Sequence, residues 1–197
     1  YKFYDPLNRD IEHGQVNALN ALQNNIANNY NKFVQWVKQG TRSEVTRYYY
    51  DTTMSKRVRK LFPNQQQKQL RQRVASVTYE EKFNNDINTY DFGIHYSYDI
   101  HGNIHFIINE NNAFPQRHKI KTIKYEYDVI SNNIKKIIYQ PNALDQFIHK
   151  YEYDEENRMT KVLTSRFGVT WEEDADFFYY PHGRLARVEL GNEKVQG

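Results

Sequence analysis

Short runs in which hydrophobic and polar residues alternate cover most of the chain, and this alternation predicts β-strands. Aromatic residues recur at positions i and i+2, which places both rings on the same face of a strand. An Asp follows each aromatic pair, and Gly or Asn often comes three positions later. Because Asp accepts backbone hydrogen bonds and Gly or Asn tolerates positive φ, the Asp predicts a turn.

A second alternating run follows each predicted turn, so the unit is a β-hairpin. The expected return strands are residues 103–108, 134–139, 158–163 and 184–190, and a further strand is expected over 73–79. Along the return strands neither face is purely apolar. Consecutive hairpins of this kind predict one long, twisted antiparallel sheet.

The aromatic-x-aromatic-Asp pattern is repeated along the sequence. Its defining residues, grouped by copy, are Tyr48, Tyr50 and Asp51; Tyr96, Tyr98, Asp99 and Gly102; Tyr125, Tyr127 and Asp128; Tyr151, Tyr153, Asp154 and Asn157; and Tyr179, Gly183, Arg184 and Leu185. In the last copy Tyr180 replaces the Asp, and Phe3-Tyr4-Asp5 is a truncated copy with Asn8 at its turn. The turn at Tyr180, which lacks the Asp, and the turns after Asp128 and Asp51, which lack Gly, are expected to differ in type.

The spacing of the copies supports a repeating unit. Asp99 to Asp128 is 29 positions, Asp128 to Asp154 is 26, and Asp154 to Tyr180 is again 26. Such a unit has room for two strands and two connections. The 48 positions from Asp51 to Asp99 predict an insertion, which we place at about residues 63–90.

Two segments depart from the two-residue period. Apolar residues of 15–39, among them Val16, Leu19, Phe33 and Val37, follow helical spacing and predict a helical insertion at about 15–40, with the helix clearest at 28–39 and a stop at Gly40. A short helix over 64–70 is expected after Pro63, and both helices are expected to pack on or plug the sheet.

These residues resemble the Rhs or YD-repeat proteins, of the type common in Bacteroidetes, whose unit reads Y-x-Y-D-x-x-G-R-L. The nearest matches are the segments 96–103 and 179–185, and the resemblance spans the whole chain, 1–197, as a single segment of a larger protein. It implies a curved, spiralling antiparallel sheet that is part of a β-shell. In that family the shell can enclose a C-terminal effector or toxin.

Composition agrees with an ordered β protein. Aromatic residues make up 15% of the chain, with 17 Tyr, although mean hydropathy is only −0.93. Tyr packs its ring while its hydroxyl stays hydrated. The net charge of +3 is compatible with any soluble protein, the absence of Cys excludes disulfides, and no apolar run is long enough for a membrane helix.

Three groups of residues are candidates for metal binding or anion binding, and each also has a simpler structural explanation. His95, His101 and His105 share one predicted hairpin but lack a third ligand placed for a metal. The acidic run Glu172, Glu173, Asp174 and Asp176 lacks the spacing of a calcium loop and is expected to be a solvated loop. The basic residues Lys56, Arg57, Arg59, Lys60, Lys68, Arg71 and Arg73 are the best case for a nucleic-acid or anionic-glycan surface, yet nucleic-acid binding is not favoured.

No nucleotide, nucleophile or metalloprotease motif occurs, and Asp99, Asp128 and Asp154 lie a repeat apart rather than in one pocket. The sequence therefore predicts no catalytic, cofactor-binding or metal-binding residue, no cofactor and no enzyme. The expected function is structural, in a secreted or cell-surface protein. Its partners are the remaining repeats of the same polypeptide and an enclosed effector or a secretion or surface complex. The alternative is an adhesin-like carbohydrate-binding or surface-binding module.

Overall fold

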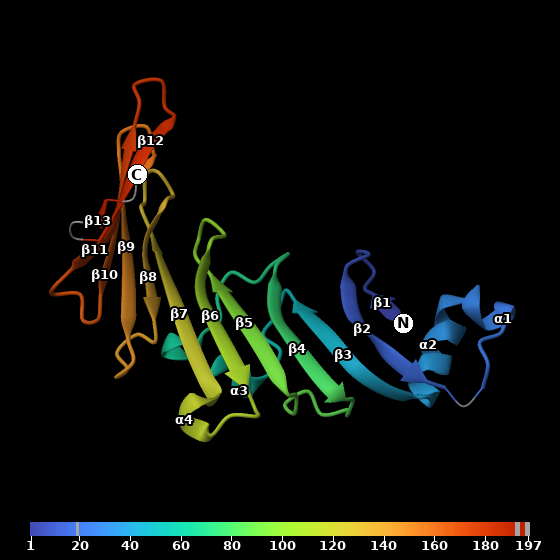
Figure 1. Cartoon of the computed structure of the whole chain (residues 1–197). Coiled ribbons are helices and arrows are strands. Elements are labelled where there is room, and N and C mark those ends of the chain that lie inside the picture. Colours follow the sequence, from blue (N-terminus) through green and yellow to red (C-terminus); the bar gives the residue numbers. More distant parts are fainter. Residues whose placement is uncertain (19, 192–193, 196–197) are drawn as a thin grey trace. The chain divides into compact units, whose positions relative to one another are not determined.

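The computed structural model describes residues 1–18, 20–191 and 194–195, and most of them lie in antiparallel β-strands joined by turns and a few short helices (Figure 1). The predicted class, all-β with minor helices, is confirmed. Leu19, a member of the predicted helical pattern, lies outside the described residues. The chain divides into two compact units, Tyr1–Ile120 and Lys121–Gly197, and each is described by itself.

Unit 1 is a six-stranded meander in which each strand pairs with the next one along the chain. Its strands are β1 (Lys2–Tyr4), β2 (Asp10–Asn17), β3 (Thr41–Tyr50), β4 (Val74–Lys82), β5 (Phe92–Tyr98) and β6 (Ile104–Asn111). Its helices are α1 (Asn24–Ala27), α2 (Tyr30–Gln39), α3 (Lys56–Arg59), the 3-10 turn η1 (Pro63–Gln65) and α4 (Gln116–Lys119).

Unit 2 continues the same strand-to-strand pattern and contains no helix among its described residues. Its strands are β7 (Ile120–Tyr127), β8 (Ile134–Tyr139), β9 (Phe147–Tyr153), β10 (Met159–Ser165), β11 (Glu172–Tyr179), β12 (Leu185–Leu190) and β13 (Lys194–Val195). Each pair within the unit is antiparallel. The predicted return strands are confirmed as β6, β8, β10 and β12, and the strand expected over 73–79 is β4.

Of the helical insertion expected at about 15–40, the helix at 28–39 is confirmed as α2, but the start is wrong, because residues 15–17 belong to strand β2. The Asn29 side chain caps it by accepting a hydrogen bond from the Lys32 amide, and the helix buries Val37. The helix expected over 64–70 is wrong. Asn64, Gln65 and Gln69 have φ near +50°, in the left-handed region that a right-handed helix cannot use, so only the short turn η1 forms.

The insertion between the Asp51 repeat and the Asp99 repeat begins and ends earlier than the predicted residues 63–90. It leaves the sheet after Asp51 and returns at Arg73, and the Asp51 amide donates to the Arg73 carbonyl at 3.1 Å. We call residues 52–72 the strap. Residues 74–82 then form strand β4, which pairs with β3 and β5, so they belong to the sheet.

The expectation of a solvated loop at the acidic run is also wrong. Glu172–Tyr179 is strand β11, and its carboxylates are used within the sheet. Lys161 on the neighbouring strand contacts Glu173 at 2.7 Å and Asp176 at 3.2 Å. Cross-strand pairing with this Lys compensates the negative charges within the strand.

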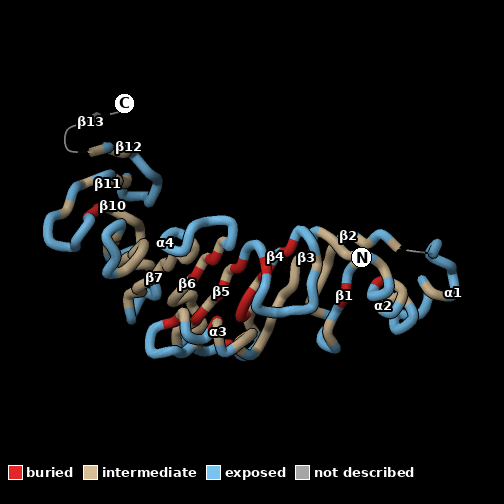
Figure 2. Tube along the Cα trace, turned by 90° about the horizontal axis from the view of Figure 1, so that it is seen from below, coloured by how far each residue is buried: buried red, intermediate tan, exposed pale blue. Residues whose placement is uncertain are grey.

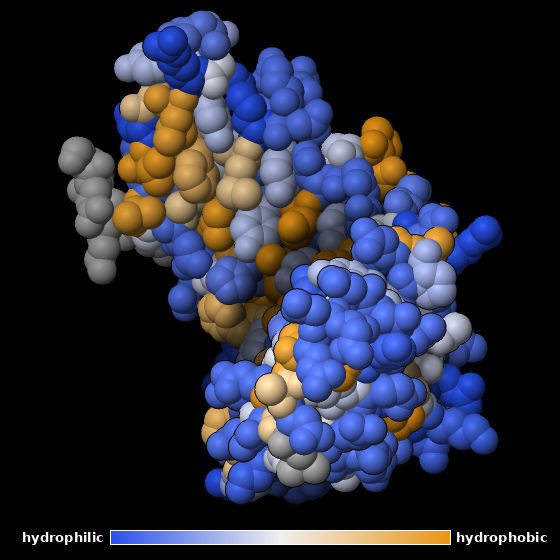
Figure 3. All heavy atoms as spheres, turned by 90° about the vertical axis from the view of Figure 1, so that its right-hand side faces the viewer, coloured by the Kyte–Doolittle hydropathy of each residue, from blue (hydrophilic) through white to orange (hydrophobic). Residues whose placement is uncertain are grey.

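Two neighbouring rows of side chains in the sheet of unit 2 differ in polarity and lie on opposite faces. Side chains in register across β9 to β12 form an apolar row, Tyr151, Val162, Ala175 and Leu190. The neighbouring positions form the charged row Glu152, Lys161, Asp176 and Glu189, which points to the opposite face. Figure 3 shows hydrophobic side chains gathered over the strands of unit 2 that lie at the top of Figure 1.

Unit 1 has a covered sheet face instead. Val58 and Phe62 of the strap pack against Ile108 of β6, and all three are buried. Met54, Leu61, Phe106 and Ile120 pack around them. Figure 2 shows the buried residues of this unit concentrated along β4, β5 and β6, beside α3. The strap therefore supplies a second layer over part of the sheet.

Among the described residues, no helix has the length and apolar character needed to cross a membrane.

Candidate functional site

Three of the aromatic-Asp turns, at Asp5, Asp99 and Asp154, share one hydrogen-bond pattern, which the Asp154 turn illustrates. The Asp154 amide donates to the Arg158 carbonyl at 3.0 Å, and the Asn157 amide donates to the Asp154 carbonyl at 3.0 Å. The Asp154 carboxylate accepts from the amides of Glu156 and Arg158 at 3.0 and 2.9 Å. The predicted Asx-turn is confirmed here, and equivalent bonds form at Asp5 and Asp99.

In four of the turns, the residue three positions after the Asp, or after Tyr180 in its place, has positive φ, as predicted. The angles are 60° at Asn8, 93° at Gly102, 62° at Asn157 and 86° at Gly183. Contrary to the expectation for this turn, the Gly183 turn keeps the backbone bonds of the other turns although Tyr180 replaces the Asp, because the Tyr180 amide donates to the Arg184 carbonyl at 2.8 Å. Backbone geometry alone therefore maintains this turn.

The Asp128 and Asp51 turns differ in type, as expected. At Asp128 the turn is one residue longer, because its amide donates to the Asn133 carbonyl and the positive φ falls on Asn132. At Asp51 the whole strap replaces the short turn, and Asp51 itself has a φ of 66°. The pair Asp51 and Arg73 thus closes the base of the strap with a backbone bond like the one that closes an ordinary turn.

The second aromatic residue of a repeat ties its strand to the preceding return strand. The hydroxyl of Tyr153 donates to the carbonyl of Ile134, the first residue of β8, at 2.9 Å. The same contact links Tyr50 to Asp10, Tyr98 to Val74 and Tyr179 to Met159, at 2.7 to 2.9 Å. In each pair the acceptor is the first residue of the adjacent strand. Sequence reasoning missed this tie, although Tyr rather than Phe at all four positions was a signal for it.

An Arg after the turn links one repeat to the next. Arg9 donates to Asp5 of its own turn and to Asp51 of the following repeat, both at 2.7 Å, and its guanidinium lies 4.3 Å from the centre of the Tyr50 ring. These two carboxylates raise the pKa of Arg9. Arg158 repeats the arrangement with Asp154 at 2.7 Å and the Tyr179 ring at 4.8 Å. These contacts join turn, strand and neighbouring repeat.

The aromatic pairs line one face of their strands, as the spacing predicted. The rings of Tyr96 and Tyr98 are stacked with centroids 6.4 Å apart, and those of Tyr125 and Tyr127 have the same separation. In the next repeat His149 and Tyr151 are stacked in this way. Tyr48 is near His13 of the adjacent strand, at 5.7 Å between ring centres. Of the other predicted residues, Leu185 begins β12 opposite Tyr179, and it is exposed.

Removing the hydroxyl of a tie should weaken the fold moderately. We expect Tyr153→Phe to lower the free energy of unfolding of unit 2 by about 0.5–1.5 kcal/mol, because the Ile134 carbonyl loses a donor. Urea unfolding monitored by circular dichroism measures the change. Tyr180→Phe is the control, since Tyr180 is 51% exposed, and it should change stability by less than about 0.5 kcal/mol. Equal effects of the two substitutions would contradict a specific role for the tie.

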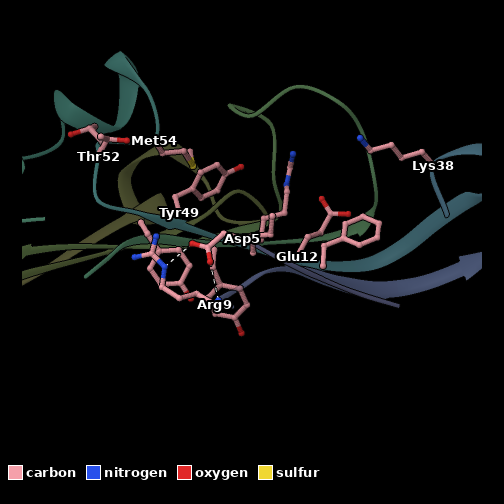
Figure 4. Close-up of a pocket in the computed structure, with 13 residues that line it drawn as sticks. Asp5, Arg9, Glu12, Lys38, Tyr49, Thr52 and Met54 are labelled. Atoms are coloured by element: carbon pink, nitrogen blue, oxygen red, sulfur yellow. Dashed lines mark hydrogen bonds and ion pairs between the residues drawn. The ribbon is translucent and has the colours of Figure 1, made fainter. Parts of the chain in front are cut away.

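The pocket next to β1, β2 and β3 has a volume of about 540 Å³ (Figure 4). Asp5 and Arg9 lie in it and point toward each other, and Arg9 also pairs with Asp51. Deeper in its wall, Arg47 pairs with Glu80, and Glu12 pairs with Arg42 at 2.8 Å. These charged groups are paired with one another and hold adjacent repeats together. None of them is therefore placed to act as a general acid or base in the pocket.

A second concentration of polar groups in unit 1 is buried except for Arg57, which is partly exposed. The His95 ring contacts the Ser76 hydroxyl at 2.9 Å through Nδ1 and the Tyr90 hydroxyl at 3.0 Å through Nε2. Tyr90 donates to Glu110 at 2.5 Å, and Arg57 of the strap donates to Glu110 at 2.7 Å. We call Ser76, Tyr90, His95, Glu110 and Arg57 the buried polar network. Gly93 makes room for it, since a Cβ there would lie 2.6 Å from the Tyr90 ring.

The pKa values in this network follow from burial and pairing. Burial lowers the pKa of His95, so the ring is neutral at physiological pH. Burial by itself would raise the pKa of Glu110, but the nearby His95 ring, whose Nε2 lies 3.6 Å away, and hydrogen bonds from Arg57 and Tyr90 hold this pKa well below its usual range. Burial, together with the Glu110 charge, raises the pKa of Tyr90. Glu110 is thus a buried carboxylate whose charge is fully compensated.

Ser76, His95 and Glu110 contain the residue types of a nucleophilic triad, but their burial excludes a substrate. Ser76, His95 and Glu110 are all 0% exposed. Catalysis at Ser76 would need open space beside its hydroxyl. Of the three histidines considered for a metal, only His95 lies in this network, and the described residues contain no group of three metal-ligating side chains. The network acts as an anchor between strap and sheet.

Acid should weaken this anchor. Because the pKa of Glu110 is lower in the folded state than its ordinary value of 4.5, its ionised form stabilises the fold above that value, and this contribution is lost as the pH falls toward the folded pKa. We expect the urea midpoint of unit 1 to fall below about pH 4.5 more steeply than that of the variant Glu110→Gln, which cannot titrate there. Parallel pH profiles of the two proteins would contradict this assignment.

No protein-family model and no curated protein matches this sequence.

Proposed function

We propose that this chain is a structural segment of YD-repeat wall in a large secreted or cell-surface protein. The observation that carries the proposal is the repeated contact between successive hairpins, in which a Tyr hydroxyl bonds the first carbonyl of the preceding strand. This contact occurs in both units with nearly constant geometry. It uses only residues of the repeat itself, so adding repeats extends the sheet without new chemistry.

The two-faced sheet of unit 2 also supports a role as a wall. Its apolar row and its charged row are both parts of a single layer, and such a layer separates two environments. The charged groups described above are paired with one another and serve the fold. By its resemblance to the YD-repeat family, the wall would belong to a β-shell that encloses or presents a C-terminal effector, with the other repeats of the same polypeptide as its main partners.

The size of the native polypeptide tests this proposal. Denaturing electrophoresis of secreted and cell-surface fractions, with peptide identification, should find these residues in a chain far larger than 23.8 kDa. Finding them in a free species of 23.8 kDa would overturn the wall and favour the adhesin-like module. A glycan array of that free species would then show whether its exposed aromatic residues bind carbohydrate.

A further inference from the structure

The strap region is strongly basic, whereas the rest of the chain is acidic. Residues 52–73 contain seven Lys and Arg residues and neither Asp nor Glu. The whole chain has a net charge of +3, so the residues outside this segment carry −4. A positive charge of this density in one surface segment attracts polyanions.

Two of the seven cations are used by the fold. Arg57 pairs with the buried Glu110 and donates to Tyr90. Arg73 lies over the Tyr98 ring at 5.5 Å and donates to the carbonyl of Gln69 at 3.1 Å. These contacts explain why two basic residues are needed here, and Arg71 helps to lower the pKa of Asp51.

Three of the remaining cations form one exposed cluster. Lys56, Arg59 and Lys60 occupy positions i, i+3 and i+4 of the α3 turn, which lie on the same helix face, and all three are exposed. No carboxylate of the described residues forms an ion pair with any of them. Like charges at this spacing destabilise a helix by roughly 0.2–0.5 kcal/mol per pair. The fold alone does not explain the cluster.

The opposite side of α3 holds the cluster in place. Val58 is buried against Ile108 and Phe62, and Arg57 is bonded to Glu110. The Ser55 side chain caps the helix by accepting from the Val58 amide at 3.3 Å. A cationic surface whose backbone is already fixed binds with a smaller loss of conformational entropy than a flexible basic tail.

We infer that Lys56, Arg59 and Lys60 form a binding surface for an anionic polysaccharide that carries sulfate or carboxylate groups. The surface lacks the features that favour nucleic acid. Phe62, the aromatic ring of the strap, is only 3% exposed and cannot stack on bases. Helix α3 has four residues, too few to lie along a DNA groove. This inference does not depend on the length of the native polypeptide, so it can fail or hold independently of the proposed wall.

Binding of the 197-residue chain to heparin, as a sulfated polysaccharide, tests the inference. We expect saturable binding at low salt that weakens as salt rises. The triple variant Lys56→Gln, Arg59→Gln, Lys60→Gln should bind at least about tenfold more weakly and reduce the slope of log K against log salt by about 2–3, as loss of three charge contacts predicts. Circular dichroism checks that the variant is folded.

A matched variant separates the cluster from net charge. The control is a second triple variant that removes the same charge from three exposed lysines on other segments, Lys32→Gln, Lys82→Gln and Lys135→Gln. This variant should bind heparin like the native chain. Equal weakening by both triple variants would overturn the inference, as would no binding by the native chain. Single-stranded or duplex DNA bound as tightly as heparin, and lost in the same triple variant, would overturn the choice of polysaccharide.

Discussion

Replacing Glu110 with Ala should destabilise unit 1 by about 1–3 kcal/mol, the cost of leaving buried hydrogen-bonding groups without their partner. The Glu110 side chain is 0% exposed and receives hydrogen bonds from Tyr90 and Arg57. Lys119 also lies 3.3 Å from its carboxylate. Without Glu110, the buried Tyr90 hydroxyl and the partly exposed Arg57 guanidinium lose their main partner.

The two Trp residues separate the units in this experiment, since Trp36 belongs to unit 1 and Trp171 to unit 2. In a Trp171→Phe background, Trp36 fluorescence during urea unfolding reports unit 1 alone. Lys2→Ala is the control in unit 1, because Lys2 pairs with Asp10 at 3.0 Å in a partly exposed site, and it should cost less than about 1 kcal/mol. A loss from Glu110→Ala as small as that of the control would show that the network is not an anchor.

The repeat pattern made the strands and turns of this fold predictable. Asp154 and Asn157 show why: an Asp that caps backbone amides and an Asn that accepts positive φ are local requirements, and local requirements are visible in one sequence. The return strands followed from alternation in the same way. The contacts of Arg158 were not predicted, because they depend on which neighbouring strand its side chain reaches.

The strap and the buried polar network could not be predicted for a related reason. Glu110 lies 53 positions from Arg57, and nothing in either local sequence indicates that they meet. The 48-position gap between Asp51 and Asp99 did reveal an insertion, but its boundaries were misplaced because β4 was counted in it. At the predicted helix 64–70, a polar sequence rich in Gln suited a helix locally, and the tertiary path over the sheet imposed left-handed residues instead.

Replacing Phe62 with Ala should cost about 3–5 kcal/mol, as truncation of a buried Phe does when the surrounding core cannot close the cavity. Phe62 is 3% exposed and packs with Val58 and Ile108, which attach the strap to β6. Limited proteolysis should then cut within residues 52–72 of the variant much faster than in the native chain. Phe167→Ala is the control, since Phe167 is 66% exposed in unit 2, and it should alter stability by less than about 0.5 kcal/mol.

Combining Phe62→Ala with Glu110→Ala tests whether the apolar cluster and the buried polar network hold the same segment. Both anchors attach the strap to β6, through Ile108 and Glu110, which lie two residues apart on that strand. Once the loss of one anchor has released the strap, removing the other anchor should have a smaller effect. The double variant should therefore lose less free energy of unfolding than the sum of the two single losses, by about 0.5–3 kcal/mol. Additive losses would mean that the two anchors act on separate parts of unit 1, and that the strap is attached by only one of them.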